Sequence, residues 1–554
     1  MATPTPVDQS PPAALDSDWV RARFPTLAGD WILMDNAGGA APLGAVIERV
    51  SEYMTRWPVQ LGASYGPSAK AGDLLATARQ DLAGLFGAGG GGAPSPEEIV
   101  VASSTTELMQ RLARAIGAEL GPGDEVVVTE VDHEANITPW RRLSERGVTV
   151  REWPLNRDTQ RLEPDDLRPL LNERTRLVCF THASNLLGEV TPVAEIAGMA
   201  RAVGARTVVD GVAYAPHRPL AVRDWGVDFY AFSLYKVYGP HCALLYGRRE
   251  HLDRFPNLNH SFYRREDVPG KLEPGAFPYE LLYGAGAVPA YVEALGQHQL
   301  QGRNSGAAVN VAYEAIQAHE HRLSSLLLDY LDARDGARVC GNPRASAERL
   351  PTVSFEVAGS ASSEIPPVGD AAGIGFRWGH FYAPRLVEAL GLTERDGVVR
   401  VSLVHYNTED EVRRLLAVLD RAWFGHGGAS AAIESIGTAS QFTSYTPQRR
   451  RRPRQPAAEQ EPAQARERGA AGAGRGPRRG AGRAPGPPRT ARAPGACGHR
   501  APEAVEPRRH PTPAAVHRQA HARRRPRPDP GRAGGRTARR RSRQAAVPAG
   551  RELA

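Results

Sequence analysis

The sequence predicts an α/β fold: a mainly parallel β-sheet sandwiched by helices, then a smaller α+β C-terminal domain and a disordered basic tail. Three observations support this prediction. The chain has 554 residues, 41% of them hydrophobic, which is enough for a large domain with a full core. Short apolar runs alternate with amphipathic stretches in its first half. The end of the chain has a composition that cannot form a core.

Residues 1–29 are expected to form an N-terminal segment and residues 30–285 a large domain. Six apolar runs in that domain are typical of strands buried on both faces of a parallel sheet. The runs are Ile99–Ser103, Glu125–Glu130, Arg176–Thr181, Arg206–Asp210, Asp228–Ser233 and Ala243–Tyr246. Because such sheets bind ligands beyond the carboxyl ends of their strands, we expect a functional site there.

One helix between these strands is marked at both ends. Thr191 and Pro192 supply an N-cap and a first-turn proline, and Gly204 stands where a C-terminal glycine belongs. The apolar face of this helix consists of Val193, Ile196, Ala197 and Ala200. Strand, helix and strand at this spacing favour a parallel sheet with helices on both faces.

Residues 286–426 are expected to form the smaller α+β domain. Long helical segments come first, and strands are predicted near Thr352–Glu356 and Gly397–Ser402. The capping box Thr408–Glu411 begins the last helix, which should end near Gly425. Its apolar face consists of Val412, Leu415, Leu416 and Leu419.

Residues 427–554 are expected to be a disordered tail rich in Arg, Pro, Ala and Gly. From Gln448 onwards it has 28 arginines, no lysine and 7 acidic residues, which is about +21 of formal charge and leaves about −13 on residues 1–447. The acidic body has no general attraction to nucleic acid. Two interpretations of the tail stay open: a shifted reading frame through GC-rich DNA, or an arm that binds nucleic acid or an anionic membrane.

Composition also argues against several protein classes. No uncharged apolar run approaches the roughly 18 residues that a membrane span needs, and the first residues lack a signal-peptide pattern, so a cytoplasmic protein is expected. The four cysteines are too widely spaced for a disulfide framework or a zinc site, so we expect reduced thiols and no metal. They are Cys179, Cys242, Cys340 and Cys497.

The chain has only three lysines, Lys70, Lys236 and Lys271. Lys236 follows one predicted strand, and Asp210 ends another. A desolvated amine has a lowered pKa and can form a Schiff base with a carbonyl. A carboxylate beside it can keep a pyridine nitrogen protonated, as pyridoxal phosphate requires. A surface lysine and a helix-capping aspartate would explain the same two residues.

Other strand ends carry polar side chains too. The segment Ser103–Glu107 begins a helix, where hydroxyls and free N–H groups can bind an anion. His133 and Asn185 follow two further strands, where an imidazole can stack on a planar ring and an amide can bond a ring oxygen. Each of these residues also fits an ordinary cap or surface position. Their combination with Asp210 and Lys236 is far more specific than any one of them.

Six motifs together resemble the class V aminotransferase or cysteine-desulfurase-like family of fold-type I pyridoxal-phosphate enzymes, across roughly residues 20–425. They are Thr-Thr-Glu at 105–107, Asp-His-Glu-Ala-Asn-Ile-Thr-Pro-Trp at 132–140, Ser-Asn-Leu-Leu-Gly at 184–188, Asp-Gly-Val-Ala at 210–213, Ser-Leu-Tyr-Lys-Val-Tyr-Gly-Pro at 233–240 and Arg-Val-Ser-Leu-Val-His-Tyr-Asn-Thr at 400–408. The resemblance implies pyridoxal 5'-phosphate as cofactor. It also implies catalytic roles for Lys236 as the Schiff-base lysine, Asp210 as the pyridine-nitrogen partner and His133 as the stacking ring.

The resemblance implies further contacts with cofactor and substrate. Asn185 would contact the ring oxygen, and Thr105, Thr106 and Ser233 would form the phosphate side. Tyr235 stands where the family usually has a histidine and is also expected to reach the phosphate. Arg400 resembles the arginine that clamps the substrate carboxylate, a task suited to its planar fork. Arg377, His380 and Tyr382 are expected on the substrate side.

One departure from the family bears on the reaction. Tyr382 stands where cysteine desulfurases of this type have a nucleophilic cysteine after a Gly-His pair. A phenol cannot form a persulfide, so we expect lyase or aminotransferase chemistry on an amino acid. Acid catalysis and simple packing stay open for Tyr382. The alternatives are a cysteine desulfurase with another sulfur acceptor, or a non-catalytic binding protein whose tail contacts nucleic acid.

A second departure concerns assembly. Lys271–Pro278 resembles the segment that reaches the phosphate of the neighbouring subunit, although Ala276 lacks the expected hydroxyl. The resemblance therefore implies a homodimer with shared sites.

Overall fold

The computed structural model describes residues 14–275, 277–300 and 307–424. The chain divides into two units, residues 1–443 and 444–554, and every described residue lies in the first. The tail at residues 427–554, with its cysteine Cys497, lies outside the described residues, as does Ala276. The disorder and nucleic-acid contact expected of the tail therefore stay predictions.

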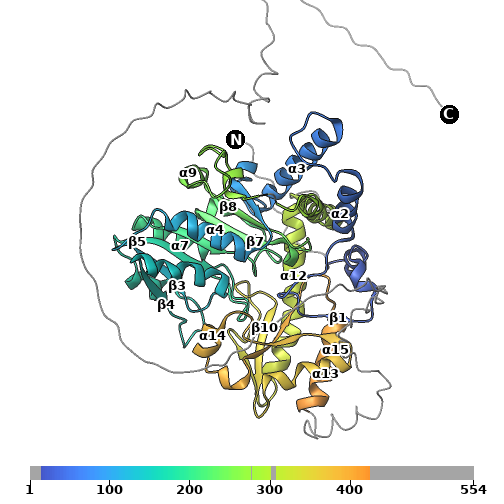
Figure 1. Cartoon of the computed structure of the whole chain (residues 1–554). Helices are drawn as coiled ribbons and strands as arrows, with labels where there is room; N and C mark the ends of the chain where they lie inside the picture. Colours follow the sequence, from blue (N-terminus) through green and yellow to red (C-terminus); the bar gives the residue numbers. More distant parts are fainter. Residues whose placement is uncertain (1–13, 276, 301–306, 425–554) are drawn as a thin grey trace, which may run out of the picture. The chain divides into compact units, whose positions relative to one another are not determined.

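A seven-stranded sheet forms the centre of the large domain (Figure 1). In spatial order its strands are β2 (Ile99–Ala102), β8 (Ala243–Gly247), β7 (Phe229–Ser233), β6 (Arg206–Asp210), β5 (Thr175–Thr181), β3 (Glu125–Thr129) and β4 (Thr149–Trp153). β8 is antiparallel to both neighbours, and the other pairs are parallel. The mainly parallel sheet is confirmed, and each predicted strand lies within one residue of its observed bounds.

Apolar side chains cover both faces of this sheet. In β3, Val126 and Val128 belong to one hydrophobic core, whereas Val127 belongs to the other. The first core is completed by α4 (Thr105–Gly117), α5 (Thr138–Arg141) and α9 (Arg249–Arg254). The second includes α1 (Ser17–Arg21), α2 (Gly44–Arg56), α3 (Gly66–Leu85), α7 (Val193–Ala202), α10 (Tyr279–Ala285) and α11 (Ala287–Gln299). Helices therefore sandwich the sheet, as the sequence predicted.

The apolar face predicted for α7 is buried, and Gly204 adopts the left-handed conformation (φ +77°) expected beyond a helix end. The predicted N-cap is wrong by one residue. α7 begins at Val193 with Pro192 as its N-cap residue, and no side chain caps it. The backbone N–H of Thr191 donates instead to His182 O (2.8 Å), which holds Thr191 in the preceding loop.

The smaller domain contains a four-stranded antiparallel sheet in the order β12 (Arg377–Gly379), β13 (Val398–Ser402), β10 (Thr352–Val357) and β9 (Ala337–Cys340). A two-stranded parallel sheet joins β1 (Ile32–Leu33) to β11 (Ile374–Gly375). The helices after residue 300 are α12 (Ala308–Asp332), α13 (Pro366–Ala371), α14 (Pro384–Ala389) and α15 (Glu409–Leu419). The capping box that begins α15 is confirmed: Thr408 Oγ1 accepts from Glu411 N, and Glu411 Oε2 accepts from Thr408 N.

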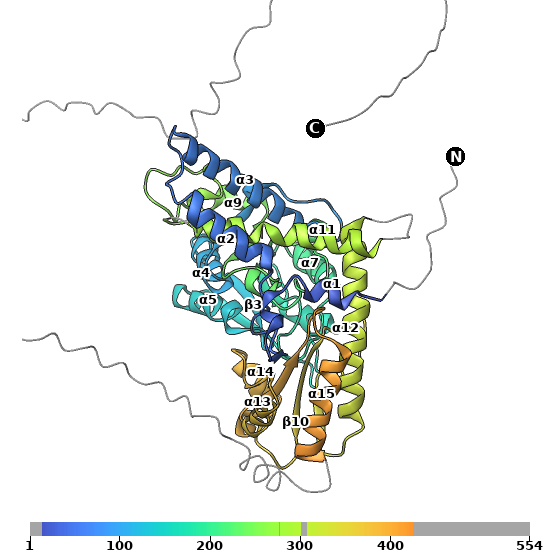
Figure 2. The same cartoon turned by 90° about the vertical axis from the view of Figure 1, so that its right-hand side faces the viewer.

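The hydrophobic contacts cross the domain boundaries that were expected at residues 29/30 and 285/286. These boundaries stay predictions. Val20 and Phe24, in the expected N-terminal segment, pack in the core of the large sheet. Ile32 and Met34, in the expected large domain, pack in the core of the small sheet. α11 packs instead with the core of the large sheet. α12 takes part in both cores, through Ile316 in one and Leu327 in the other, and Figure 2 shows it as a long helix beside both regions.

Within the described residues, no helix is long and apolar enough to cross a membrane. In the same part of the chain, no cluster of three or more His, Cys, Asp or Glu side chains is arranged to hold a metal ion.

Candidate active site

A pocket of about 490 Å³ lies where the strands of the large sheet end. The side chains that line it are Ser104, Thr105, Thr106, His133, Ala135, Thr181, Ala183, Asn185, Asp210, Val212, Ala213, Ser233, Tyr235 and Lys236. Every residue predicted to contact the cofactor is among them. Their individual roles stay predictions.

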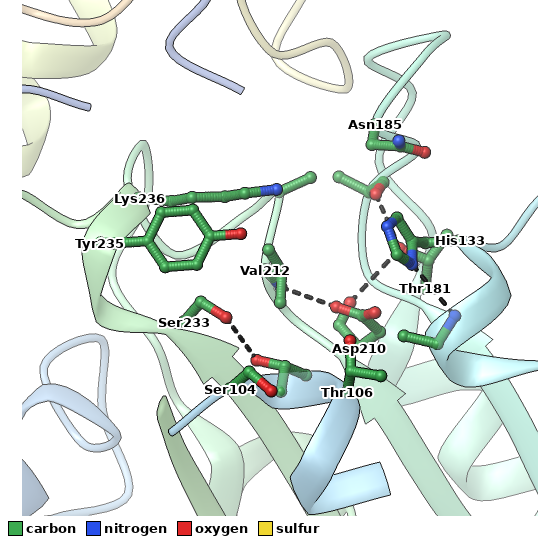
Figure 3. A pocket seen from close by; sticks show the side chains of 14 residues that line it. Ser104, Thr106, His133, Thr181, Asn185, Asp210, Val212, Ser233, Tyr235 and Lys236 are labelled. Atoms are coloured by element: carbon green, nitrogen blue, oxygen red, sulfur yellow. Dashed lines mark hydrogen bonds between the residues drawn. The ribbon is translucent and has the colours of Figure 1, made fainter. Parts of the chain in front are cut away.

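The turn after β7 places Lys236 at the pocket. Leu234 is buried, and its backbone N–H donates to Cys242 O (2.8 Å), which fixes the start of the 3-10 turn Leu234–Lys236. In Figure 3, Lys236 extends along one side of the pocket, in the direction of Asn185. Ser104, Thr106 and Ser233 lie on the opposite side in this view.

The surroundings of Lys236 lower the pKa of its amine to about 8. Burial is the largest cause, and the positive charge of Arg400 adds to it, whereas Asp210 and Asp35 act in the opposite direction. A substantial fraction of the amine is therefore neutral near pH 8, and the neutral amine is the form that attacks a carbonyl.

The other two lysines have different surroundings. Lys70 is exposed on α3. Lys271 is fully buried, and its Nζ donates to the carbonyl oxygens of Asp253 (3.1 Å), Phe255 (3.0 Å) and Arg265 (2.7 Å). Lys271 therefore holds a loop together, and Lys236 is the lysine that lines the pocket.

Asp210 ends β6 as a buried carboxylate. Its Oδ1 accepts from Val212 N (2.9 Å), while its Oδ2 has no hydrogen-bond partner among the described residues. Burial raises the pKa of this carboxyl, and the hydrogen bond from Val212 and the charge of Lys236 oppose the rise. An oxygen that still lacks a donor, on a carboxylate that lines the pocket, fits a protonated ring nitrogen.

His133 begins the 3-10 turn Glu134–Asn136, and its Nδ1 accepts from Ala135 N (3.0 Å). Burial is the main reason that its pKa falls to about 4, and the charges of Lys236 and Arg400 contribute. The ring is therefore neutral at pH 7, with its proton on Nε2. An uncharged flat ring in this position fits stacking against an aromatic cofactor.

A cluster of hydroxyls lies at the first turn of α4. Thr105 Oγ1 and Ser233 Oγ are hydrogen-bonded (2.7 Å), and Thr106 is exposed beside them. Ser104 is the N-cap of α4, and its Oγ accepts from Glu107 N (3.2 Å). Hydroxyls at the positive end of a 13-residue helix fit a phosphate group.

The residues predicted on the substrate side are not among those that line this pocket. Arg400 is 2% exposed and connects to the pocket through Asn185, whose backbone oxygen accepts from Arg400 Nη1 (3.2 Å). The side-chain amide of Asn185 donates to Phe381 O (2.9 Å), so Asn185 joins the large domain to the segment that contains Tyr382.

Tyr382 itself is 65% exposed, with its ring centroid 5.1 Å from that of His133. Its backbone oxygen accepts from Glu134 N (2.8 Å), and its backbone N–H donates to His380 Nδ1 (3.1 Å). The structure therefore brings Tyr382 beside His133. His380 and Arg377 are exposed.

Sequence reasoning missed Asp35, which pairs with Arg400 (Oδ1 to Nη2, 2.7 Å). The two arginine partners of Asp35 are 342 and 365 residues away in the chain. Local patterns carry no signal of such a pair. Thr181 also lines the pocket, and no role was predicted for it.

Taken together, these groups fit pyridoxal phosphate. The pocket offers an amine with a pKa of about 8, a carboxylate oxygen without a donor among the described residues, an uncharged imidazole and a hydroxyl cluster at a helix N-terminus. The amine suits the aldehyde of that cofactor, and the carboxylate oxygen suits its pyridine nitrogen. The imidazole suits the face of its ring, and the hydroxyl cluster suits its phosphate.

Comparisons with known proteins agree with this geometry. The Aminotransferase class-V family matches residues 32–415. The aminotransferase-like protein FGM3 of Gibberella zeae is 41% identical over 411 residues, 72% of this chain and 97% of its own length. A cysteine desulfurase of Pectobacterium carotovorum is 33% identical and is covered over 97% of its length, against 73% of this chain.

A solved structure shows the same fold. The cysteine desulfurase CsdA of Escherichia coli aligns with a TM-score of 0.62 and 27% sequence identity, over 74% of this chain and 98% of that one. The predicted family and the fold-type I architecture are therefore confirmed. The chain belongs to the class-V aminotransferase family, which includes cysteine desulfurases and depends on pyridoxal phosphate.

Proposed function

We propose that this protein is a pyridoxal-phosphate-dependent enzyme that performs lyase or aminotransferase chemistry on an amino acid, with Lys236 as the residue that holds the coenzyme. One observation carries the proposal: an amine of lowered pKa, a buried carboxylate, an imidazole and a hydroxyl cluster line the same pocket. The related aminotransferase-like protein and cysteine desulfurases support the reaction class.

Each of these groups has a role in the proposal. Pyridoxal phosphate, when bound, supplies an electron sink for negative charge on the carbon beside an amino group. Asp210 would pair with its ring nitrogen, His133 would lie against its ring, and the hydroxyls at the start of α4 would hold its phosphate. Lys236 then removes or returns a proton at the α-carbon of the substrate, for which a base with a pKa near the working pH is effective.

The cysteines argue against a persulfide step. Cys179, Cys242 and Cys340 are all buried, and none of them lines the pocket. Burial raises the pKa of Cys242 and of Cys340 to about 12, and the pKa of Cys179 is also raised, so these thiols are poor nucleophiles. Desulfurase chemistry would therefore need a sulfur acceptor other than these three cysteines of the described residues.

We also propose that the enzyme is a cytoplasmic homodimer. An apolar groove lies beside α2 and is lined by Val46, Ile47, Val50, Tyr235 and Leu281, among others. On the same helix, Ile47 is 47% and Met54 is 61% exposed. A second copy of the chain would cover this surface next to Tyr235 of the pocket. Sedimentation equilibrium of the full chain tests this assembly.

The first test is for the cofactor. The full chain, purified with pyridoxal phosphate, should show a visible absorption band and, after borohydride reduction, a coenzyme adduct on Lys236 detectable by mass spectrometry. Lys236→Ala should lose the adduct completely, because the reacting amine is gone. Lys70→Ala is the matched control and should keep it. A colourless wild-type protein without an adduct would favour the non-catalytic binding protein.

The second test is for the reaction. The coloured enzyme is incubated with cysteine, cysteine conjugates, alanine and kynurenine, while sulfide, pyruvate and keto acids are assayed. We expect pyruvate or a keto acid without a protein-bound persulfide. Detection of a persulfide on the purified enzyme would contradict the proposal and indicate a genuine desulfurase.

A further inference from the structure

Asp35 lies between two arginines of the small sheet. Arg377 and Arg400 are directly opposite each other on the antiparallel strands β12 and β13. Like charges in such a cross-strand pair repel each other. Asp35 offsets this repulsion, because its Oδ1 is 2.7 Å from Arg400 Nη2 and its Oδ2 is 3.5 Å from Arg377 Nη1.

The two arginines differ in burial. The side chain of Arg400 is 2% exposed and that of Arg377 is 58% exposed, with Asp35 between them at 25%. A buried cation needs a counter-charge, and among the described residues Asp35 is the carboxylate that pairs with Arg400. Arg377 faces solvent and does not depend on Asp35 in the same way.

The guanidinium of Arg400 has an N–H group without a hydrogen-bond acceptor among the described residues. Its Nη1 donates to Asn185 O (3.2 Å), and its plane lies over the ring of Phe381 (3.8 Å to the ring centroid). Its Nε is buried without a hydrogen-bond partner among the described residues. Arg400 therefore keeps unused donor capacity beside Asn185, a residue that lines the pocket.

The carboxylate of Asp35 is free to change partner. Its backbone is fixed, because β1 pairs with β11 and Asp35 forms a bridge with Ser402. Its side chain, in contrast, accepts hydrogen bonds from Arg400 and Arg377 and from no other described residue. Release of Arg400 would break one contact and leave the contact with Arg377 in place.

We propose that Asp35 is a displaceable counter-ion: it neutralises Arg400 when no substrate is present, and it yields Arg400 to the substrate carboxylate while it stays paired with Arg377. This inference rests on the proposed function and on the role that the family resemblance implies for Arg400, the binding of the substrate carboxylate. Arg377 acts through Asp35 and is therefore a positioning residue.

The proposal predicts opposite effects of two substitutions. Asp35→Asn removes the competing negative charge, so a carboxylate should bind about tenfold more tightly, the change expected for one hydrogen bond to a charged group. Arg377→Gln removes the second partner of Asp35, so Asp35 should stay on Arg400 and a carboxylate should bind about three- to tenfold more weakly. In the Asp35→Asn background, the effect of Arg377→Gln should disappear.

The experiment is a titration of the coenzyme-loaded full chain, followed through the visible absorption of the coenzyme. The probes are L-alanine and ethylamine, which lacks the carboxylate. The proteins are the wild type, both single variants and the double variant, with Asp35→Glu as a variant that retains the charge. Asp124→Asn is the matched control, since Asp124 also pairs with an arginine, Arg176 (2.9 Å). This pair lies at the starts of β3 and β5, whereas the pocket lies where the strands end.

We expect the changes with L-alanine only, with Asp35→Glu and Asp124→Asn similar to wild type. Weaker L-alanine binding in Asp35→Asn would overturn the proposal, because Asp35 would then hold Arg400 in place. The proposal would also be overturned if the affinity for ethylamine changed as much as that for L-alanine. The same holds if the effect of Arg377→Gln persisted in the double variant. If Asp35→Asn does not fold, Asp35→Ser replaces it. A wild type without any coenzyme band would contradict the proposed function, and this inference with it. If the band is present but the variants do not show the expected changes in L-alanine binding, this inference alone is overturned.

Discussion

The reactivity of Lys236 depends first on burial and only then on charge. Desolvation and Arg400 lower the pKa of the amine to about 8, and the carboxylates of Asp210 and Asp35 limit the fall. The two carboxylates lie on different parts of the chain: Asp210 ends a strand of the large sheet, and Asp35 follows β1 near the N-terminus. A substitution of either carboxylate would therefore lower this pKa further.

This pKa predicts how coenzyme binding depends on pH. Since the neutral amine attacks the aldehyde, the initial rate of adduct formation on Lys236 should rise about tenfold per pH unit below about 8 and level off above it. Borohydride trapping between pH 6 and pH 10, quantified by mass spectrometry, measures this rate. A rate that keeps rising up to pH 10 would show an unperturbed lysine instead.

The pocket residues could be predicted from the sequence because they follow buried strands, and the ends of parallel strands converge. Lys236, Asp210 and His133 were all found in this way. The pairing of Arg400 with Asp35 could not be predicted, because 365 residues separate the two and no periodic pattern connects them. The exposure of Tyr382 could not be predicted either, since it depends on how residues 381–382 turn through positive φ angles.

At the level of elements, the buried strands of the large sheet were predictable and its edge strand β4 was not. β5, β6 and β7 each contain two or more consecutive buried apolar residues, because both faces of these strands are covered. β4 lies at the edge of the sheet, and its Thr149 and Glu152 are exposed. Its mixed polar composition therefore gives no strand signal. The helix α15 was predictable because its capping box is a local pattern.

The capping box leads to a prediction about stability. Thr408→Ala removes the oxygen that accepts from Glu411 N, and the loss of such a cap costs about 1 kcal/mol of the free energy of unfolding. Urea denaturation followed by circular dichroism measures the change. Thr408→Ser keeps the acceptor and should stay close to wild type. An equal loss in both variants would attribute the effect to the methyl group.

In the whole described molecule, one long helix connects two hydrophobic cores. α12 contributes Ile316 to the core of the large sheet and Leu327 to that of the small sheet. The sequence indicated two domains, because the pattern changes after Gly286. The sequence did not predict that α12 packs in the cores of both domains, because an apolar stripe on a helix does not reveal which core it faces.

The position of the site within the chain predicts the effect of truncation. All described residues of the pocket and of the Asp35 pair lie between residues 14 and 424, so a chain that ends at residue 447 should load coenzyme as the full chain does. Its visible absorption and thermal unfolding temperature should both be unchanged. A loss of coenzyme binding would show that the tail supports the site.

The same truncation tests the basic tail. If the 28 arginines after residue 447 bind phosphate backbones, the full chain should bind nucleic acid with a steep dependence on salt, and the shortened chain should not. Equal binding by both chains would exclude an arm of this kind.

The pairing of β1 with β11 has a consequence for synthesis. Asp35 leaves the ribosome 365 residues before Arg400. At about 5–20 residues per second, the beginning of the chain waits about 20–70 s for its partner. Ile32 and Met34 spend that interval without the core that later covers them. About 400 of the 554 residues must therefore be translated before the carboxylate of Asp35 can pair with Arg400.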